Sequence, residues 1–170
     1  MKSEEDRNYN NNTQAFIDNM KSAFVKKIYF DLDTDPCFDI QHIPFNFKYC
    51  NAITIVTNAD IFTMHTAMNS DGDFTFWIHS TPATQYSPIF QDVDSLVKSI
   101  NATYFYDSYA YKIELEFENS NLILYAGEIY DEENGFNCAI YDEMILVFEN
   151  KTDADIFEQL SLLKKTSKYK

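Results

Sequence analysis

The sequence is poor in glycine, in cysteine pairs and in long apolar segments, and each shortage excludes a class of protein. Only 3 of the 170 residues are glycine, which argues against phosphate-binding loops, because those loops need backbone that approaches the ligand closely. The 3 cysteines form no Cys-x-x-Cys pair, and we expect them to be reduced thiols. No apolar run reaches the ~20 residues of a membrane helix, and the polar residues 1–12 do not resemble a secretion signal. We therefore expect a cytoplasmic protein.

Basic side chains are missing from residues 113–150, although this stretch carries ten carboxylates. The whole chain has 27 acidic and 13 basic residues, a net charge of −14. A field of one sign repels nucleic acid and anionic membranes and attracts basic partners. The composition therefore favours binding to a basic protein, with no direct nucleic-acid binding and no membrane association. The ten carboxylates belong to Glu114, Glu116, Glu118, Glu128, Asp131, Glu132, Glu133, Asp142, Glu143 and Glu149.

The pattern of apolar residues predicts one α+β domain over residues 13–166, between a flexible N-terminal arm (1–12) and a basic tail (167–170). The expected sheet is largely antiparallel, because the loops are short, with about six to seven strands and three helices in the order αβ-βββ-α-βββ-α. Thr13 is the expected N-cap of the first helix. The other expected elements are a strand at 27–32, strands at 52–57, 61–68 and 74–80, a helix at 91–101, strands at 110–117, 122–130 and 137–148, and a helix from Thr152.

Two motifs near the end of the first expected strand fail on inspection. Residues 27–34 resemble the first motif of haloacid-dehalogenase-type phosphatases, in which Asp-x-Asp ends a strand, but the usual glycine is missing and Pro36 follows. The same acids fit the first ligand positions of an EF-hand, but Pro36 and His42 stand where that loop needs glycine and glutamate. His65 and His79 lie in neighbouring expected strands without a metal-binding spacing. We predict no catalytic residue, no metal site and no cofactor.

The expected strand 110–117 alternates apolar with charged residues, which places Glu114 and Glu116 on the face away from the core. We expect further acids and tyrosines to share that surface, because carboxylates steer a basic partner and aromatic rings supply desolvated anchors. The predicted partner-binding residues are Glu114, Glu116, Glu128, Asp142, Glu143, Tyr125, Tyr130 and Tyr141.

Small, acidic, aromatic-rich α+β chains without catalytic motifs resemble bacterial immunity proteins, which neutralise contact-dependent and other polymorphic toxins. The resemblance implies a non-enzymatic inhibitor that covers or plugs the basic active site of a nuclease-type toxin. Two alternatives stay open. One is a DNA mimic that inhibits a defence enzyme, since Glu114 and Glu116 lie roughly 7 Å apart along a strand, as successive phosphates do. The other is a small enzyme with a histidine and carboxylate site.

Overall fold

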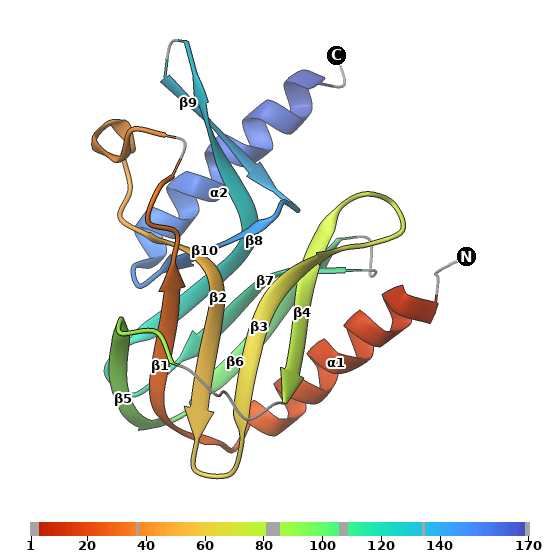
Figure 1. The fold of residues 1–170 in the computed structure, drawn as a ribbon, viewed down its shortest axis with the longest axis vertical. Helices are drawn as coiled ribbons and strands as arrows, with labels where there is room; N and C mark the ends of the chain where they lie inside the picture. The colour runs from red at the N-terminus through yellow and green to blue at the C-terminus, as the bar shows by residue number, and fades with distance from the viewer. Residues whose placement is uncertain (1–3, 37, 81–85, 106–108, 134, 169–170) are drawn as a thin grey trace.

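A computed structural model describes residues 4–36, 38–80, 86–105, 109–133 and 135–168, and the side chains of these residues as far as Ser161. Within this part of the chain, ten strands form one sheet, accompanied by two α-helices and one short 3-10 helix (Figure 1). The elements are α1 (Glu4–Met20), β1 (Phe24–Leu32), η1 (Ile40–His42), β2 (Lys48–Thr57), β3 (Ile61–Met68), β4 (Phe74–Ser80), β5 (Phe90–Leu96), β6 (Ser99–Phe105), β7 (Tyr109–Glu116), β8 (Asn121–Glu132), β9 (Gly135–Ile140), β10 (Met144–Phe148) and α2 (Lys151–Lys168). The α+β class with antiparallel pairing is confirmed.

The sheet is antiparallel and curled, and two of its strands, β2 and β8, each pair with three other strands. Along one edge β2 pairs with β1, and along the other it pairs first with β10 and then with β3. In the same way β8 has β10 on one edge, and β7 followed by β9 on the other. The chain from β5 to β6 links the two ends of the sheet, because β5 pairs with β1 and β6 pairs with β7.

The larger core lies inside the curl and is covered by α1. The apolar side of this helix, Phe16, Ile17 and Met20, is buried among the inward side chains of the strands. On β7, Ile113 and Leu115 face this core, as the alternation predicts. The N-terminal half of α1 is held by the buried carboxylate of Asp6, which accepts hydrogen bonds from the backbone and hydroxyl of Ser70 and from the hydroxyl of Tyr109.

The second core lies on the outer face of β8, β9 and β10, where α2 packs across the strands (Figure 1). Phe157 of α2 contacts Tyr125 and Phe148 with ring centroids 5.1 and 5.4 Å apart. Burial of such rings is worth about 1.5–3 kcal/mol each. No helix in the described part of the chain is long and apolar enough to cross a membrane.

The predicted helix at 91–101 is wrong, because this segment forms β5 and the beginning of β6. Its apolar residues Val93, Val97 and Ile100 recur at helical spacing, which led to the error. The spacing has another origin: Asp94 has a φ of 45°, and the chain passes from its pairing with β1 to its pairing with β7 at Val97. These irregularities turn residues three and four positions apart to the same core.

The limits of several other elements also differ from the prediction. The first helix begins at Glu4 rather than at Thr13, since the turn after β3 buries Asp6. The predicted strand 137–148 is two strands, β9 and β10, separated by a turn at Tyr141 with a φ of 67°. In the described part of the chain, ten strands and two α-helices therefore replace the expected six to seven strands and three helices. Of the predicted basic tail, residues 167 and 168 belong to α2, and 169–170 lie outside the described residues.

Candidate functional site

Strand β8 leads from the larger core to an acidic edge of the molecule. Leu122, Leu124 and Ala126 face the larger core from alternate positions. Because side chains alternate along a strand, Glu128 and Tyr130 continue the same row beyond the apolar part of the core. Glu128 is half-buried there, whereas Tyr130 is 44% exposed.

Three carboxylates from two other parts of the chain act on Glu128 at this edge. They come from Asp33, just after β1, and from Asp142 and Glu143, in the turn between β9 and β10. We call Asp33, Glu128, Tyr130, Asp142 and Glu143 the acidic rim. These segments are far apart in sequence. The sheet brings them to one edge, because its strand order here is β1, β2, β10, β8.

Hydrogen bonds hold the acidic rim in place. The hydroxyl of Tyr130 donates to the carboxylate of Asp142, which also accepts from the backbone N–H of Glu143 at 2.8 Å. The hydroxyl of Thr66 donates to the carbonyl oxygen of Glu143 and so ties the turn to β3. The backbone N–H of Asp33 donates to the carbonyl oxygen of Tyr49 at 2.9 Å, which fixes the end of β1.

The rim changes the ionisation of Glu128. Burial is the largest cause, and together with the charges of Asp142, Glu143 and Asp33 it raises the pKa of the Glu128 carboxyl to about 7, against the opposing effect of a hydrogen bond from the N–H of Ile129. This carboxyl therefore keeps its proton to a much higher pH than an ordinary glutamate does. A cation placed beside it would lower the pKa, release the proton and gain a full ion pair.

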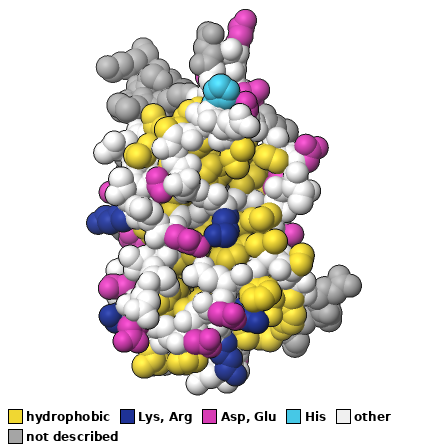
Figure 2. Space-filling model, turned by 90° about the vertical axis from the view of Figure 1, so that its left-hand side faces the viewer, with side chains coloured by type: hydrophobic (Ala, Val, Ile, Leu, Met, Phe, Trp, Pro, Cys, Tyr) yellow, Lys and Arg dark blue, Asp and Glu magenta, His cyan; other side chains and the backbone are white. Residues whose placement is uncertain are grey.

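A second acidic feature lies at the tip of the hairpin formed by β8 and β9. It is a hollow of about 340 Å³ between η1 and the β8–β9 turn. Its lining residues are Asp39, His42, Asp131, Glu132, Glu133, Gly135 and Phe136. Acidic side chains also mark the upper end of the molecule in Figure 2; among the described side chains, which are drawn in colour, Lys and Arg appear in the middle and lower parts of this view. Rim and hollow together make this end suitable for a cationic surface.

Four of the predicted partner-binding residues meet in the rim: Glu128, Tyr130, Asp142 and Glu143. Glu114 and Glu116 do not join them. Glu116 pairs with Asn121 at the far end of β8, about 23 Å along the strand from Glu128 at ~3.3 Å per residue, and its carboxylate accepts from the hydroxyl of Ser99. The single acidic face expected from the sequence is thus two separate regions.

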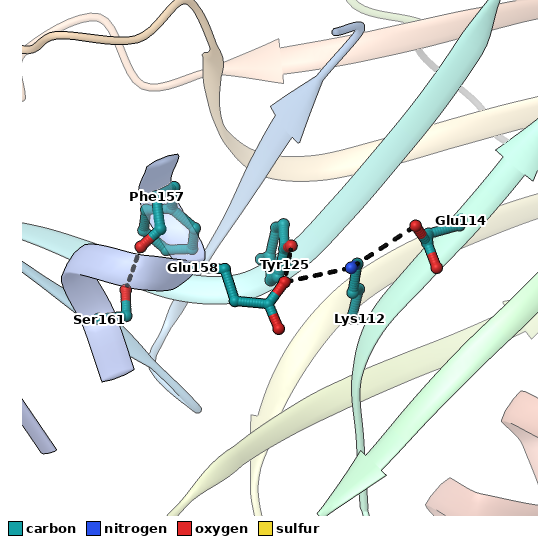
Figure 3. A network of polar contacts seen from close by, with 6 residues as sticks. All are labelled: Lys112, Glu114, Tyr125, Phe157, Glu158 and Ser161. Atoms are coloured by element: carbon teal, nitrogen blue, oxygen red, sulfur yellow. Dashed lines mark hydrogen bonds and ion pairs between the residues drawn. The ribbon is translucent and has the colours of Figure 1, made fainter. Parts of the chain in front are cut away.

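The prediction of Tyr125 as a surface anchor is wrong, since its side chain is fully buried. Its hydroxyl donates to the carboxylate of Glu158 at 2.6 Å, and burial, followed by this bond, raises its pKa. The ammonium of Lys112 lies 3.2 Å from Glu158 and 3.5 Å from Glu114 (Figure 3). These charges are used to fasten α2 to β7 and β8.

Tyr141 has a structural role in the turn. Its ring packs against Tyr111 with centroids 4.8 Å apart, and its carbonyl oxygen accepts from the N–H of Phe74. It shapes the backbone that carries Asp142 and Glu143. The sequence reasoning missed Asp33, which was considered only as part of the two rejected motifs at the end of the first expected strand.

Among the described residues, no three His, Cys, Asp or Glu side chains gather closely enough to hold a metal ion. Glu128 has the perturbed ionisation that is typical of functional sites, but the hydrogen-bonded groups around it are acidic. Function is therefore inferred from the acidic rim and the hollow. No protein family, curated protein or solved structure matches this chain.

Proposed function

We propose that this chain is a non-enzymatic inhibitor of the immunity type, which covers the basic active site of a nuclease-type toxin with its acidic rim and hollow. The observation that carries the proposal is the gathering of the Asp33, Asp142 and Glu143 carboxylates around Glu128, where burial, the largest cause, and these charges together raise its pKa to about 7. Such crowding costs stability, and a cationic partner would relieve it. A nuclease holds the phosphates of its substrate with Lys and Arg, so carboxylates can occupy the same positions.

The rim also offers an aromatic anchor. Tyr130 is exposed, and its hydroxyl is already bonded to Asp142. A side chain fixed before binding loses less conformational entropy in the complex. Exposed tyrosines at the centre of an interface often supply much of its binding free energy. We assign Tyr130 this role in place of Tyr125.

The DNA-mimic alternative has less support. It depends on Glu114 and Glu116 as stand-ins for phosphates, but Glu114 forms an ion pair with Lys112. The carboxylates of the rim come from a strand end, a strand and a turn, and do not follow one strand at a regular spacing.

Two matched triple variants test the location of the docking surface. The rim variant carries Glu128→Gln, Asp142→Asn and Glu143→Gln. The control variant carries Asp94→Asn, Glu116→Gln and Glu118→Gln, three exposed acids elsewhere. Each replaces three carboxyls with amides. At about pH 8.5, above the pKa of Glu128, both remove nearly the same charge, so that mainly the place differs.

The binding partner in this test is a basic, nuclease-type toxin domain, to be sought first in a secreted protein encoded next to this chain's gene. We expect the wild-type chain to form a 1:1 complex with it and to block its nuclease activity. The rim variant should bind about 30- to 100-fold more weakly, and the control variant within about threefold of wild type. Equal losses in the two variants would contradict the docking surface, and no inhibition by the wild-type chain would contradict the toxin class.

A further inference from the structure

Two histidines stand side by side on the outer face of the β3–β4 hairpin. In this hairpin Thr63 pairs with His79 and His65 pairs with Trp77, so the two imidazoles are diagonal neighbours on one face. Their ring centroids are 5.6 Å apart and their planes differ by 9°. The ring of Trp77 lies 5.9 Å from His65 and 5.1 Å from His79.

This separation matches that of two imidazoles on one metal ion. A zinc–nitrogen bond of about 2.0–2.1 Å, plus about 1.1 Å from the nitrogen to the ring centre, places each centroid about 3.2 Å from the ion. At a tetrahedral angle the two centroids then lie about 5.2 Å apart, close to the observed distance. Rotation of the ring about χ2, which has a broad preference in histidine, turns a nitrogen toward the neighbour without moving the centroid far.

The surroundings favour the protonation state that binds metal. His65 is half-buried, and burial, followed by the charge of His79, lowers its pKa. The imidazole is therefore neutral near pH 7 and can donate its lone pair. Asp31 of β1 acts on His65 in the opposite direction, and its negative charge would also attract a cation to this face.

We propose that His65 and His79 form a two-histidine binding site for a first-row transition metal ion, with water completing the coordination. Imidazole suits Cu²⁺, Ni²⁺ and Zn²⁺, and the expected order of affinity places Cu²⁺ first. Mg²⁺ and Ca²⁺ prefer oxygen ligands and should not bind here. This site goes beyond the proposed inhibitor function and does not depend on it.

Trp77 makes the site easy to observe, because it is the single tryptophan of the chain. Bound Cu²⁺ or Ni²⁺ should quench its fluorescence in a saturable 1:1 titration, at about micromolar concentrations for Cu²⁺, whereas Mg²⁺ should have no effect. His65→Gln and His79→Gln should each weaken binding at least about tenfold, because one imidazole alone cannot chelate. His42→Gln is the control for metal binding: this exposed histidine lies on η1, beside Asp39, and its loss should leave the quenching of Trp77 unchanged.

A second measurement uses the unaltered chain and so does not depend on the folding of a variant. Zn²⁺ should protect His65 and His79, but not His42, from acylation by diethyl pyrocarbonate. Lowering the pH to about 5.5 should weaken Cu²⁺ binding, since protons compete for the imidazoles. Quenching that needs millimolar metal, that survives in both single variants, or that leaves His65 and His79 open to acylation would overturn the site and show adventitious binding only.

Discussion

Glu128 is the residue at which the electrostatics of the acidic rim can be measured directly. Its pKa rises from the ordinary 4.5 to about 7 on folding. A carboxyl with a raised folded-state pKa contributes stability that is fully present below about pH 4.5 and is lost as the pH rises through about 7. Above that pH the chain retains a crowded carboxylate at a free-energy cost.

Glu128→Gln should therefore stabilise the protein in a pH-dependent way. We expect the free energy of unfolding to rise by about 1 to 2 kcal/mol near pH 8, after allowance for solvent screening at a half-exposed group, and to change little near pH 4. Urea denaturation at the two pH values measures both. Glu116→Gln, a neutralisation at an exposed site, should show no such difference, and an equal gain for Glu128→Gln at both pH values would contradict the raised pKa.

For individual residues, the sequence alone could have shown that two of the predicted tyrosines lie on different faces of their strand. Tyr125 and Tyr130 are five positions apart on one strand, and alternation places them on opposite faces. What the sequence does not contain is the position of α2, which covers the face of Tyr125 and leaves Tyr130 exposed. The role of Asp33 was also beyond sequence reasoning, because a pairing of distant strands brings it near Glu128.

Strands β8 and β9 and helix α2 meet at Gly127, where the elements approach most closely. A Cβ atom added there would lie 2.7 Å from the carbonyl oxygen of Ala139 and 3.1 Å from the ring of Phe157. The first distance is shorter than real contacts allow, and the obstacle is backbone. The glycine is thus required for β9 to pair with β8 underneath α2.

Gly127→Ala should loosen this junction. We expect a loss of about 1 to 3 kcal/mol in the free energy of unfolding, which is typical of overpacking. Hydrogen exchange should speed up at the amides of β9 and remain unchanged in β6, which serves as an internal control. A stability equal to that of the unaltered chain would show that β8 and β9 adjust without cost.

The elements themselves were partly readable from the sequence. The alternation of β7 was predicted and is confirmed by the burial of Ile113 and Leu115. The segment of β5 and β6 was not, since an irregular strand can imitate the spacing of a helix, and pairing with β1 and β7 decides between them. Local pattern is a weak guide where tertiary contacts override propensity.

For the whole molecule, the antiparallel α+β class followed from short loops and mixed periodicity. The strand order did not follow, because β2 and β8 each change partners along their length. That change of partners brings acids from the end of β1, from β8 and from the β9–β10 turn to one edge. The uneven distribution of a net charge of −14 should therefore be visible in how the molecule meets a basic partner.

The most direct test is the salt dependence of association between this chain and the toxin domain that we propose as its partner. Stopped-flow measurements between about 0.05 and 0.5 M salt should show the association rate of the wild-type chain falling at least about tenfold, because salt screens the attraction. The rim variant should have a shallower slope than the control variant of equal charge. A rate that does not change with salt, or identical slopes for the two variants, would contradict docking through the acidic rim.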